Sequence, residues 1–249
     1  MNLKLTTIKE GGDVYQFVIQ GTGEYTILLE SGLDDDLSTW NPIFNKLSKT
    51  TRVFAYNRSG YGMAKMSNKQ KDANSVAENL MKLLRSNDIK GPYIVMGHSL
   101  GGQYSLAFAN LYPEDVAEIV LLDTRPPEFD TKCTEREIGL CEVPKPVYLL
   151  WSKHVKKEYD DSRLYNESQL SDLKNIKHTP LIVITRDKNK GMESQKFKDF
   201  WNEMQHDMLN LSDNSKYYEI KNSGHYVYKK EPSRIVDIVT NSIKQIDSK

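Results

Sequence analysis

The sequence predicts a single α/β domain with a mostly parallel, twisted sheet flanked by helices. Strand-like and helix-like segments alternate from end to end of the 249 residues, which is typical of parallel strands joined by helical crossovers. No Pro-, Gly- or Ser-rich linker divides the chain, so we expect residues 1–249 to share one core. A Gly-x-Ser-x-Gly run also lies between an apolar segment and a helical pattern.

The first quarter of the chain is predicted to be rich in strands. Four are expected before residue 60: Leu3–Lys9, Val14–Gln20, Tyr25–Glu30 and Arg52–Tyr56. The first two form a hairpin around Gly11 and Gly12. Between the last two strands, apolar residues recur at helical spacing from Trp40 to Leu47, and Ser38 can cap that helix.

The most specific motif is Gly97-His98-Ser99-Leu100-Gly101, between the apolar segment Tyr93–Met96 and the helical pattern Tyr104–Ala109. In this strand–turn–helix context the run is typical of a nucleophile elbow, where a strained serine projects its hydroxyl from a sharp turn. The flanking glycines let strand and helix approach closely. Ser99 is therefore the predicted nucleophile, and the alternative is an ordinary strand-to-helix turn.

A serine hydroxyl needs a base to take its proton, and His225 is the candidate. It follows the strand-like run Tyr217–Ile220, with Gly224 beside it, so its loop can swing over the sheet end. Serine before histidine is the chain order that such a site uses. The alternative is a solvated loop histidine. Four other histidines are weaker candidates: His98, His154, His178 and His206.

The second half of the chain contains an irregular stretch between regular elements. Val120–Asp123 and Pro180–Ile184 are predicted strands, and residues 124–179 between them are too long for a plain connection. We interpret this stretch as an inserted lid, with short helices near Val147–Trp151 and Ser168–Leu173. Two further helices are predicted afterwards: Glu193–Leu211 and Ile235–Ile246.

Taken in order, these segments resemble the α/β-hydrolase fold over most of the chain. The matching pieces are the oxyanion strand and loop Ile27–Leu33, the D-R-x-G-x-G-like Tyr56–Gly62, the elbow Gly91–Gly102, the strands Val120–Asp123 and Pro180–Ile184, and the histidine loop Ser223–His225. Two positions depart from the family pattern. Ser31 stands where most members have histidine, and Asn57 stands where they have aspartate.

The resemblance implies a serine hydrolase mechanism. Ser99 would attack an acyl carbon while His225 takes and returns the proton, and the backbone N–H groups of Leu33 and Leu100 would hold the oxyanion. Asp123 is the favoured acid to orient His225. Asp187 is the alternative, since most members place their acid after that later strand, although it falls one residue early. Asp130 and Glu128 come next.

The resemblance leaves the substrate open. A small ester is the default, a thioester or amide comes next, and a C–C hydrolase or an acyltransferase would use the same triad. Some members of this fold are instead receptors that close a lid on a bound small molecule. We expect a small-molecule acyl substrate and no cofactor, because the triad chemistry needs none. The sequence does not give the oligomeric state.

Composition excludes several other classes of protein. Lys and Arg together number 34, as do Asp and Glu, so the net charge of zero gives no basis for nucleic-acid binding. No metal-ligand spacing appears, and no apolar run approaches the ~20 residues of a membrane span. The first residues lack a signal peptide pattern. We therefore predict a cytoplasmic protein, with Cys133 and Cys141 as free thiols rather than a bridge.

Overall fold

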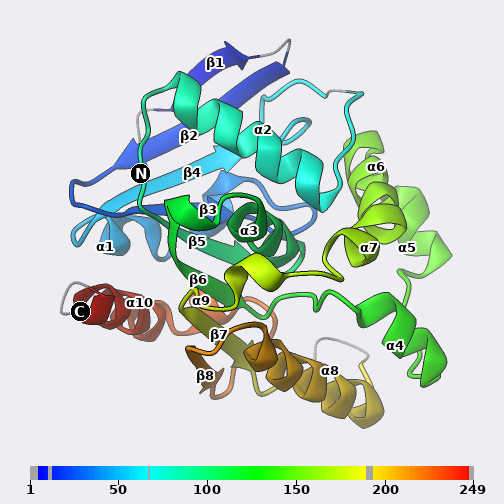
Figure 1. The fold of residues 1–249 in the computed structure, drawn as a ribbon. Coiled ribbons are helices and arrows are strands. Elements are labelled where there is room, and N and C mark those ends of the chain that lie inside the picture. Colours follow the sequence, from blue (N-terminus) through cyan, green and yellow to red (C-terminus); the bar gives the residue numbers. More distant parts are fainter. Residues whose placement is uncertain (1–4, 11–12, 67, 189–192, 247–249) are drawn as a thin grey trace.

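A computed structural model of the chain describes residues 5–10, 13–66, 68–188 and 193–246. At its centre is an eight-stranded sheet with the strand order β1-β2-β4-β3-β5-β6-β7-β8 (Figure 1). The strands are β1 (Thr6–Glu10), β2 (Asp13–Gln20), β3 (Thr26–Glu30), β4 (Arg52–Asn57), β5 (Tyr93–His98), β6 (Val116–Leu122), β7 (Leu181–Arg186) and β8 (Ser215–Ile220). Strand β2 is antiparallel to β1 and β4, and the other pairs are parallel. The predicted mostly parallel sheet is confirmed.

Helices cover both faces of this sheet. They are α1 (Phe44–Leu47), α2 (Ala73–Ser86), α3 (Leu100–Leu111), α4 (Phe129–Glu135), α5 (Lys145–Leu150), α6 (Lys153–Asp161), α7 (Glu167–Gln169), α8 (Gln195–Asp207), α9 (Val227–Lys230) and α10 (Pro232–Ile246). Buried side chains of α2 and α3 share one core cluster with the sheet, and those of α1 and α10 share another. The chain is therefore a three-layer α/β structure.

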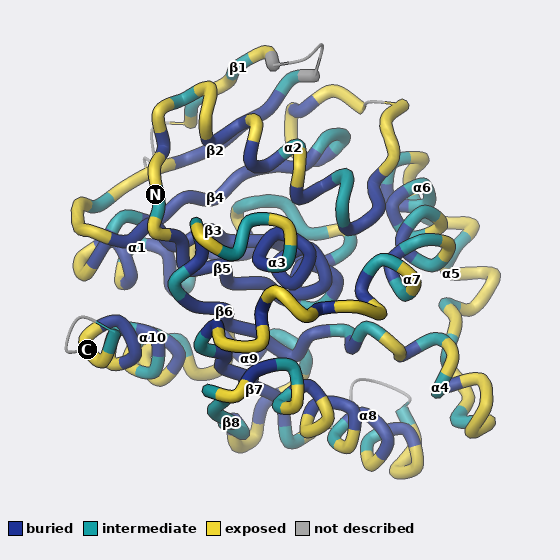
Figure 2. The backbone as a smooth tube through the Cα atoms, in the orientation of Figure 1, coloured by how far each residue is buried: buried dark blue, intermediate teal, exposed yellow. Residues whose placement is uncertain are grey.

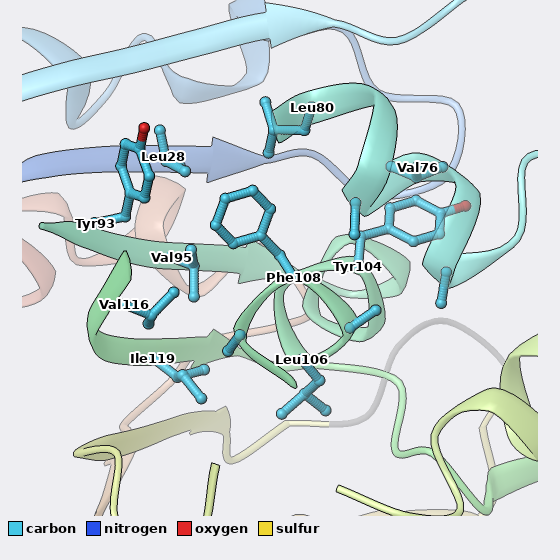
Figure 3. Packing of buried hydrophobic residues seen from close by; sticks show 14 of the residues in the cluster. Leu28, Val76, Leu80, Tyr93, Val95, Tyr104, Leu106, Phe108, Val116 and Ile119 are labelled. Atoms are coloured by element: carbon cyan, nitrogen blue, oxygen red, sulfur yellow. The ribbon is translucent and has the colours of Figure 1, made fainter. Parts of the chain in front are cut away.

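The centre of the sheet is buried because helices cover it on both sides. Every residue of β3 and of β5 is buried. Consecutive strand residues point to opposite faces, so Leu28 joins the α2–α3 cluster while Ile27 joins the other. Figure 3 shows Phe108 of α3 near Val95 of β5, and Tyr104 of α3 beside Val76 of α2. Such strands read as apolar runs, which made them easy to predict.

The stretch between β6 and β7 forms a largely helical insertion, residues 123–180. It contains α4 to α7, and Figure 2 shows much of its surface as exposed or intermediate. The predicted helix near residue 147 is present as α5. Near residue 168, by contrast, α7 ends at Gln169 and is preceded by a π-helical turn, Ser162–Asn166. Helices α4 and α6 were not predicted.

One local prediction, the helix cap at Ser38, is wrong, and part of another, the first hairpin, lies outside the described residues. Asp36, not Ser38, caps the first helical turn, because its carboxylate accepts the Ser38 backbone N–H at 2.8 Å. Asp residues are among the preferred N-caps. The predicted hairpin is present as β1 and β2. Residues 3–4, 11 and 12, which the prediction included, lie outside the described part of the chain.

The prediction of free thiols is wrong in this structure. Cys133, near the end of α4, and Cys141, in the turn after it, form a disulfide with their Cα atoms 5.6 Å apart. The Ile138 backbone N–H donates to the Cys133 carbonyl, which turns the chain back toward the helix. Disulfides are typical of oxidising compartments, so this bridge weighs against the predicted cytoplasmic location.

Candidate active site

Ser99 has the backbone of a nucleophile elbow. Its φ of 54° and ψ of −121° place it in a region that residues other than glycine rarely adopt. A side chain at either flanking glycine would clash with the backbone. A Cβ at Gly97 would lie 2.4 Å from the Gly101 carbonyl oxygen, and a Cβ at Gly101 would lie 2.2 Å from the Glu30 carbonyl oxygen. Strand β5, helix α3 and strand β3 therefore approach closely only because these positions have no side chain.

Asp123 directly follows the neighbouring strand β6 and also has a positive φ, of 42°. Its side chain is fully buried, and its Oδ2 lies 2.6 Å from Nδ1 of His225. His225 lies in the loop between β8 and α9. The structure thus brings together the predicted base and the favoured acid, on loops that follow strands of the same sheet.

Three further side chains bind the Asp123 carboxylate. The Trp201 indole N–H and the Thr185 hydroxyl donate to Oδ1 at 2.9 and 3.0 Å, and the Arg186 guanidinium lies 3.4 Å from Oδ2. Burial raises the pKa of Asp123, but His225, Arg186 and Trp201 together lower it to about 2. The carboxylate is therefore ionised and can orient the Nδ1–H of His225.

None of these three partners was predicted from the sequence. Trp201 belongs to an apolar stripe of α8 that reads as core packing, and it does pack against Phe197 and Phe129. The stripe gives no sign that one indole N–H reaches an acid on a different element. Arg186 sits in a charged run that reads as surface, yet it is buried.

Asp187, the alternative acid, has a different position. Its Oδ1 accepts the backbone N–H of Ser223 at 3.0 Å, so it binds the chain two residues before His225. Asp130 is bound to Arg125 and Arg163, and Glu128 to Lys132. Asp123, the favoured acid, is in direct contact with the His225 side chain.

The predicted oxyanion donors come from two elements. Leu100 is the first residue of α3, where backbone N–H groups have no intrahelical acceptor. Leu33 follows Gly32 in the loop after β3. The carbonyls of Ser31 and Gly32 accept hydrogen bonds from the Arg58 guanidinium at 2.7 and 2.8 Å, which fixes the start of this loop.

The two departures from the family pattern have structural accounts. The Ser31 hydroxyl accepts the indole N–H of Trp40 at 2.9 Å beneath the loop. Asn57 accepts the Leu37 backbone N–H at 2.7 Å and donates to Gln16 at 3.2 Å. Neither contact changes the backbone N–H of Leu33, so both replacements serve local packing.

A buried charge cluster joins the oxyanion loop to the insertion. Arg58 also donates to Glu158 of α6 at 2.8 Å. Glu158 accepts the Tyr104 hydroxyl at 3.0 Å and lies 3.6 Å from Lys71. The Arg58 and Glu158 side chains are 5% and 0% exposed. Because buried charges persist only when paired, this cluster fixes α6 against the body of the protein.

Of the remaining histidines, His98 is buried, while His154 and His206 pack on Tyr61 and Tyr217. His178 lies beside Asp213 at the surface.

Over the described ranges, no cluster of three or more His, Cys, Asp or Glu residues could hold a metal ion. Nor is any helix in the described part of the chain long and apolar enough to span a bilayer.

Comparison with known proteins identifies the fold. The family model of the alpha/beta hydrolase fold matches residues 25–138, which include Leu33, Ser99 and Asp123. An esterase from Thermogutta terrifontis superimposes with a TM-score of 0.71 at 18% identity over 97% of both chains. A serine hydrolase of carbazole degradation gives 0.68 at 16% identity, over 98% of this chain and 99% of the other.

Relatives found by sequence are less informative about function. The uncharacterized protein YqjL of Bacillus subtilis is 25% identical over 223 residues, which is 86% of this chain and 81% of that protein. The chain therefore has the α/β-hydrolase fold, as the resemblance predicted, and the family model matches its residues 25–138.

Proposed function

We propose that this chain is a serine hydrolase that cleaves a small ester through an acyl-enzyme at Ser99. Ser99 attacks the ester carbonyl as its proton passes to His225. The C–O bond then breaks and the alcohol leaves with that proton. Water, activated by His225, attacks the acyl-enzyme and releases the acid. Each proton therefore moves through His225, and the reaction needs no cofactor.

The observation that carries this proposal is the short contact between Asp123 and His225. With Nδ1–H donated to an ionised carboxylate at 2.6 Å, Nε2 is the ring nitrogen with a lone pair available for the serine proton. The N–H groups of Leu33 and Leu100 serve as oxyanion donors, each contributing about 3 kcal/mol to the transition state. The esterase among the structural neighbours supports an ester as substrate.

The test uses short-chain p-nitrophenyl esters together with a fluorophosphonate probe. We expect wild-type protein to turn over the ester repeatedly and to carry the probe on Ser99, located by peptide mass spectrometry. Ser99→Ala should lower kcat by at least about 10⁴-fold and abolish labelling. Ser86→Ala, at an exposed position on α2, is the matched control and should change neither.

The same experiment separates the rival functions. Covalent labelling without turnover of any ester would favour a ligand receptor. Transfer of the acyl group to an added alcohol in preference to water would favour an acyltransferase, and cleavage of a β-diketone would favour a C–C hydrolase. Wild-type turnover that survives in Ser99→Ala would contradict the proposed nucleophile.

A further inference from the structure

His98, the residue before Ser99, binds the main chain of His225. Its imidazole is buried, and its Nε2 lies 3.0 Å from the His225 carbonyl oxygen. A carbonyl oxygen only accepts, so Nε2 must carry a hydrogen. The His98 ring also lies 4.5 Å from the His225 ring, between ring centroids. The elbow strand therefore contacts the histidine loop directly through this side chain.

The other nitrogen of His98 faces a carboxylate. Its Nδ1 lies 3.7 Å from Oδ2 of Asp35, and both atoms are buried without a hydrogen-bond partner in the described part of the chain. If Nδ1 carried no hydrogen, two lone pairs would face each other and both buried atoms would stay unsatisfied, which is unfavourable. A proton on Nδ1 converts this arrangement into an ion pair.

The groups around the pair favour an ionised Asp35. The Tyr226 hydroxyl donates to its Oδ1 at 3.3 Å, and the Lys229 ammonium lies 3.6 Å from the Tyr226 ring centroid. Burial raises the pKa of Asp35, but His98, Lys229 and Tyr226 lower it below its usual range. Asp34 precedes it in the chain. Besides the Asp35 carboxylate, three titratable rings face His98, those of His225, Tyr226 and Tyr228.

This pair lies close to Ser99 and to Gly32. A Cβ placed on Gly32 would be 3.1 Å from both Asp35 Oδ2 and His98 Nδ1, and 3.3 Å from the Cβ of Ser99. Asp35 also lies two residues after Leu33, in the loop that supplies one oxyanion donor. One charged contact thus joins three loops: the oxyanion loop, the elbow and the histidine loop.

We propose that Asp35 and His98 are positioning residues, in which an Asp35 carboxylate and a His98 imidazolium hold the His225 main chain and the oxyanion loop in register. This proposal rests on the proposed role of His225 as the base. Asp35 acts through His98 and does not touch the substrate, so its effect should fall on kcat rather than on KM.

Nuclear magnetic resonance reads the protonation of His98 independently of activity. In ¹⁵N-histidine-labelled protein at pH 7, we expect one ring, absent from the His98→Gln spectrum, to have both nitrogens protonated. In Asp35→Asn the same ring should lose the Nδ1 proton, because its counter-ion is gone. A wild-type His98 with an unprotonated Nδ1 would overturn the proposal. This measurement remains interpretable even if Ser99 is never labelled, the result that would refute the proposed function.

The kinetic test measures the rate of fluorophosphonate labelling at Ser99, together with ester kcat and KM. Asp35→Asn should lower the labelling rate and kcat about ten- to a hundredfold with KM unchanged, as a displacement of about 1 Å would. Asp34→Asn makes the same charge change one residue away and should alter neither by more than about twofold.

A double variant tests whether Asp35 acts through His98. Glutamine at position 98 keeps an N–H donor for the His225 carbonyl but has no charge for Asp35. His98→Gln should therefore retain more activity than His98→Leu, and adding Asp35→Asn to His98→Gln should cost no more than about twofold. Equal costs of Asp35→Asn with and without His98 would show that Asp35 acts elsewhere. Thermal unfolding of each variant identifies any that fails to fold.

Discussion

The elbow at Ser99 and helix α6 of the insertion both adjoin the oxyanion loop, but different forces hold them there. The elbow is held by backbone: glycines at 97 and 101 allow close approach, and parallel strands fix the ends of β5 and β6. Helix α6 is held by side chains, because Glu158 carries a charge into a buried cluster with Arg58 and Lys71.

The two regions should therefore respond differently to substitution. Positive φ at Ser99 and Asp123 costs about 1–3 kcal/mol each, and the surrounding sheet, formed by many residues, offsets that cost. Removing one member of a buried charge cluster leaves its partner unpaired, which costs about 3–5 kcal/mol. Side-chain substitutions at the elbow should therefore lower kcat, whereas those in the charge cluster should lower the free energy of unfolding.

The largest expected effect separates the two candidate acids. Asp123→Asn should lower kcat about 10⁴-fold, because an amide no longer holds His225 in the tautomer that accepts the serine proton. Asp187→Asn keeps an oxygen that can accept the Ser223 N–H, so kcat should fall less than about tenfold. Steady-state kinetics at saturating ester compare the two. A larger loss in Asp187→Asn would assign the acid to that position.

The turn around Ser99 could be predicted from the sequence because the residues that determine it are local. A serine between spaced glycines, after an apolar strand, specifies its own turn, and parallel strands bring successive loops to one edge. The acid was predictable only as a pair of alternatives, since Asp123 and Asp187 both follow strands. Its partners could not be found, because Trp201 is 78 residues from Asp123 and its spacing signals only a helix face.

The insertion was less predictable because its anchor is not local. Lys153–Asp161 has the composition of a solvated face, and nothing in it marks Glu158 as the residue that meets Arg58, 100 positions earlier. The cysteines were misassigned for a different reason. Their state was inferred from the absence of an export pattern, whereas the turn after α4 brings them together.

A smaller, structural effect tests the charge cluster. Glu158→Ala should lower the free energy of unfolding by about 3–5 kcal/mol, because Arg58 and Lys71 lose their shared buried partner. Urea denaturation measures this change. Glu135→Ala, at an exposed position on α4, is the control and should cost less than about 0.5 kcal/mol. Equal stability of the two variants would show that the cluster does not anchor α6.

The smallest effect concerns the disulfide. Cys133→Ser with Cys141→Ser should lower the free energy of unfolding by about 2–3 kcal/mol, the loop-closure contribution expected for so short a separation. Ester kcat should stay within about twofold, because the bridge lies in and just after α4, whereas Ser99, Asp123 and His225 follow strands of the sheet. Alkylation of the unreduced, denatured protein followed by mass spectrometry counts free thiols. Two alkylated cysteines would return the assignment to free thiols.

The shared guanidinium at position 58 has a consequence for how a ligand reaches Ser99. Because Arg58 binds the carbonyls of Ser31 and Gly32 as well as Glu158, an outward movement of α6 would also disturb the loop that carries Leu33, the proposed oxyanion donor. Helix α5 has no buried residue, and its hydrogen bond to α6, from the Tyr148 hydroxyl to Asp160 at 2.8 Å, is exposed. We therefore expect a ligand to enter by displacement of α5 while α6 stays in place. The entry of a ligand would then leave the contacts of Arg58 intact.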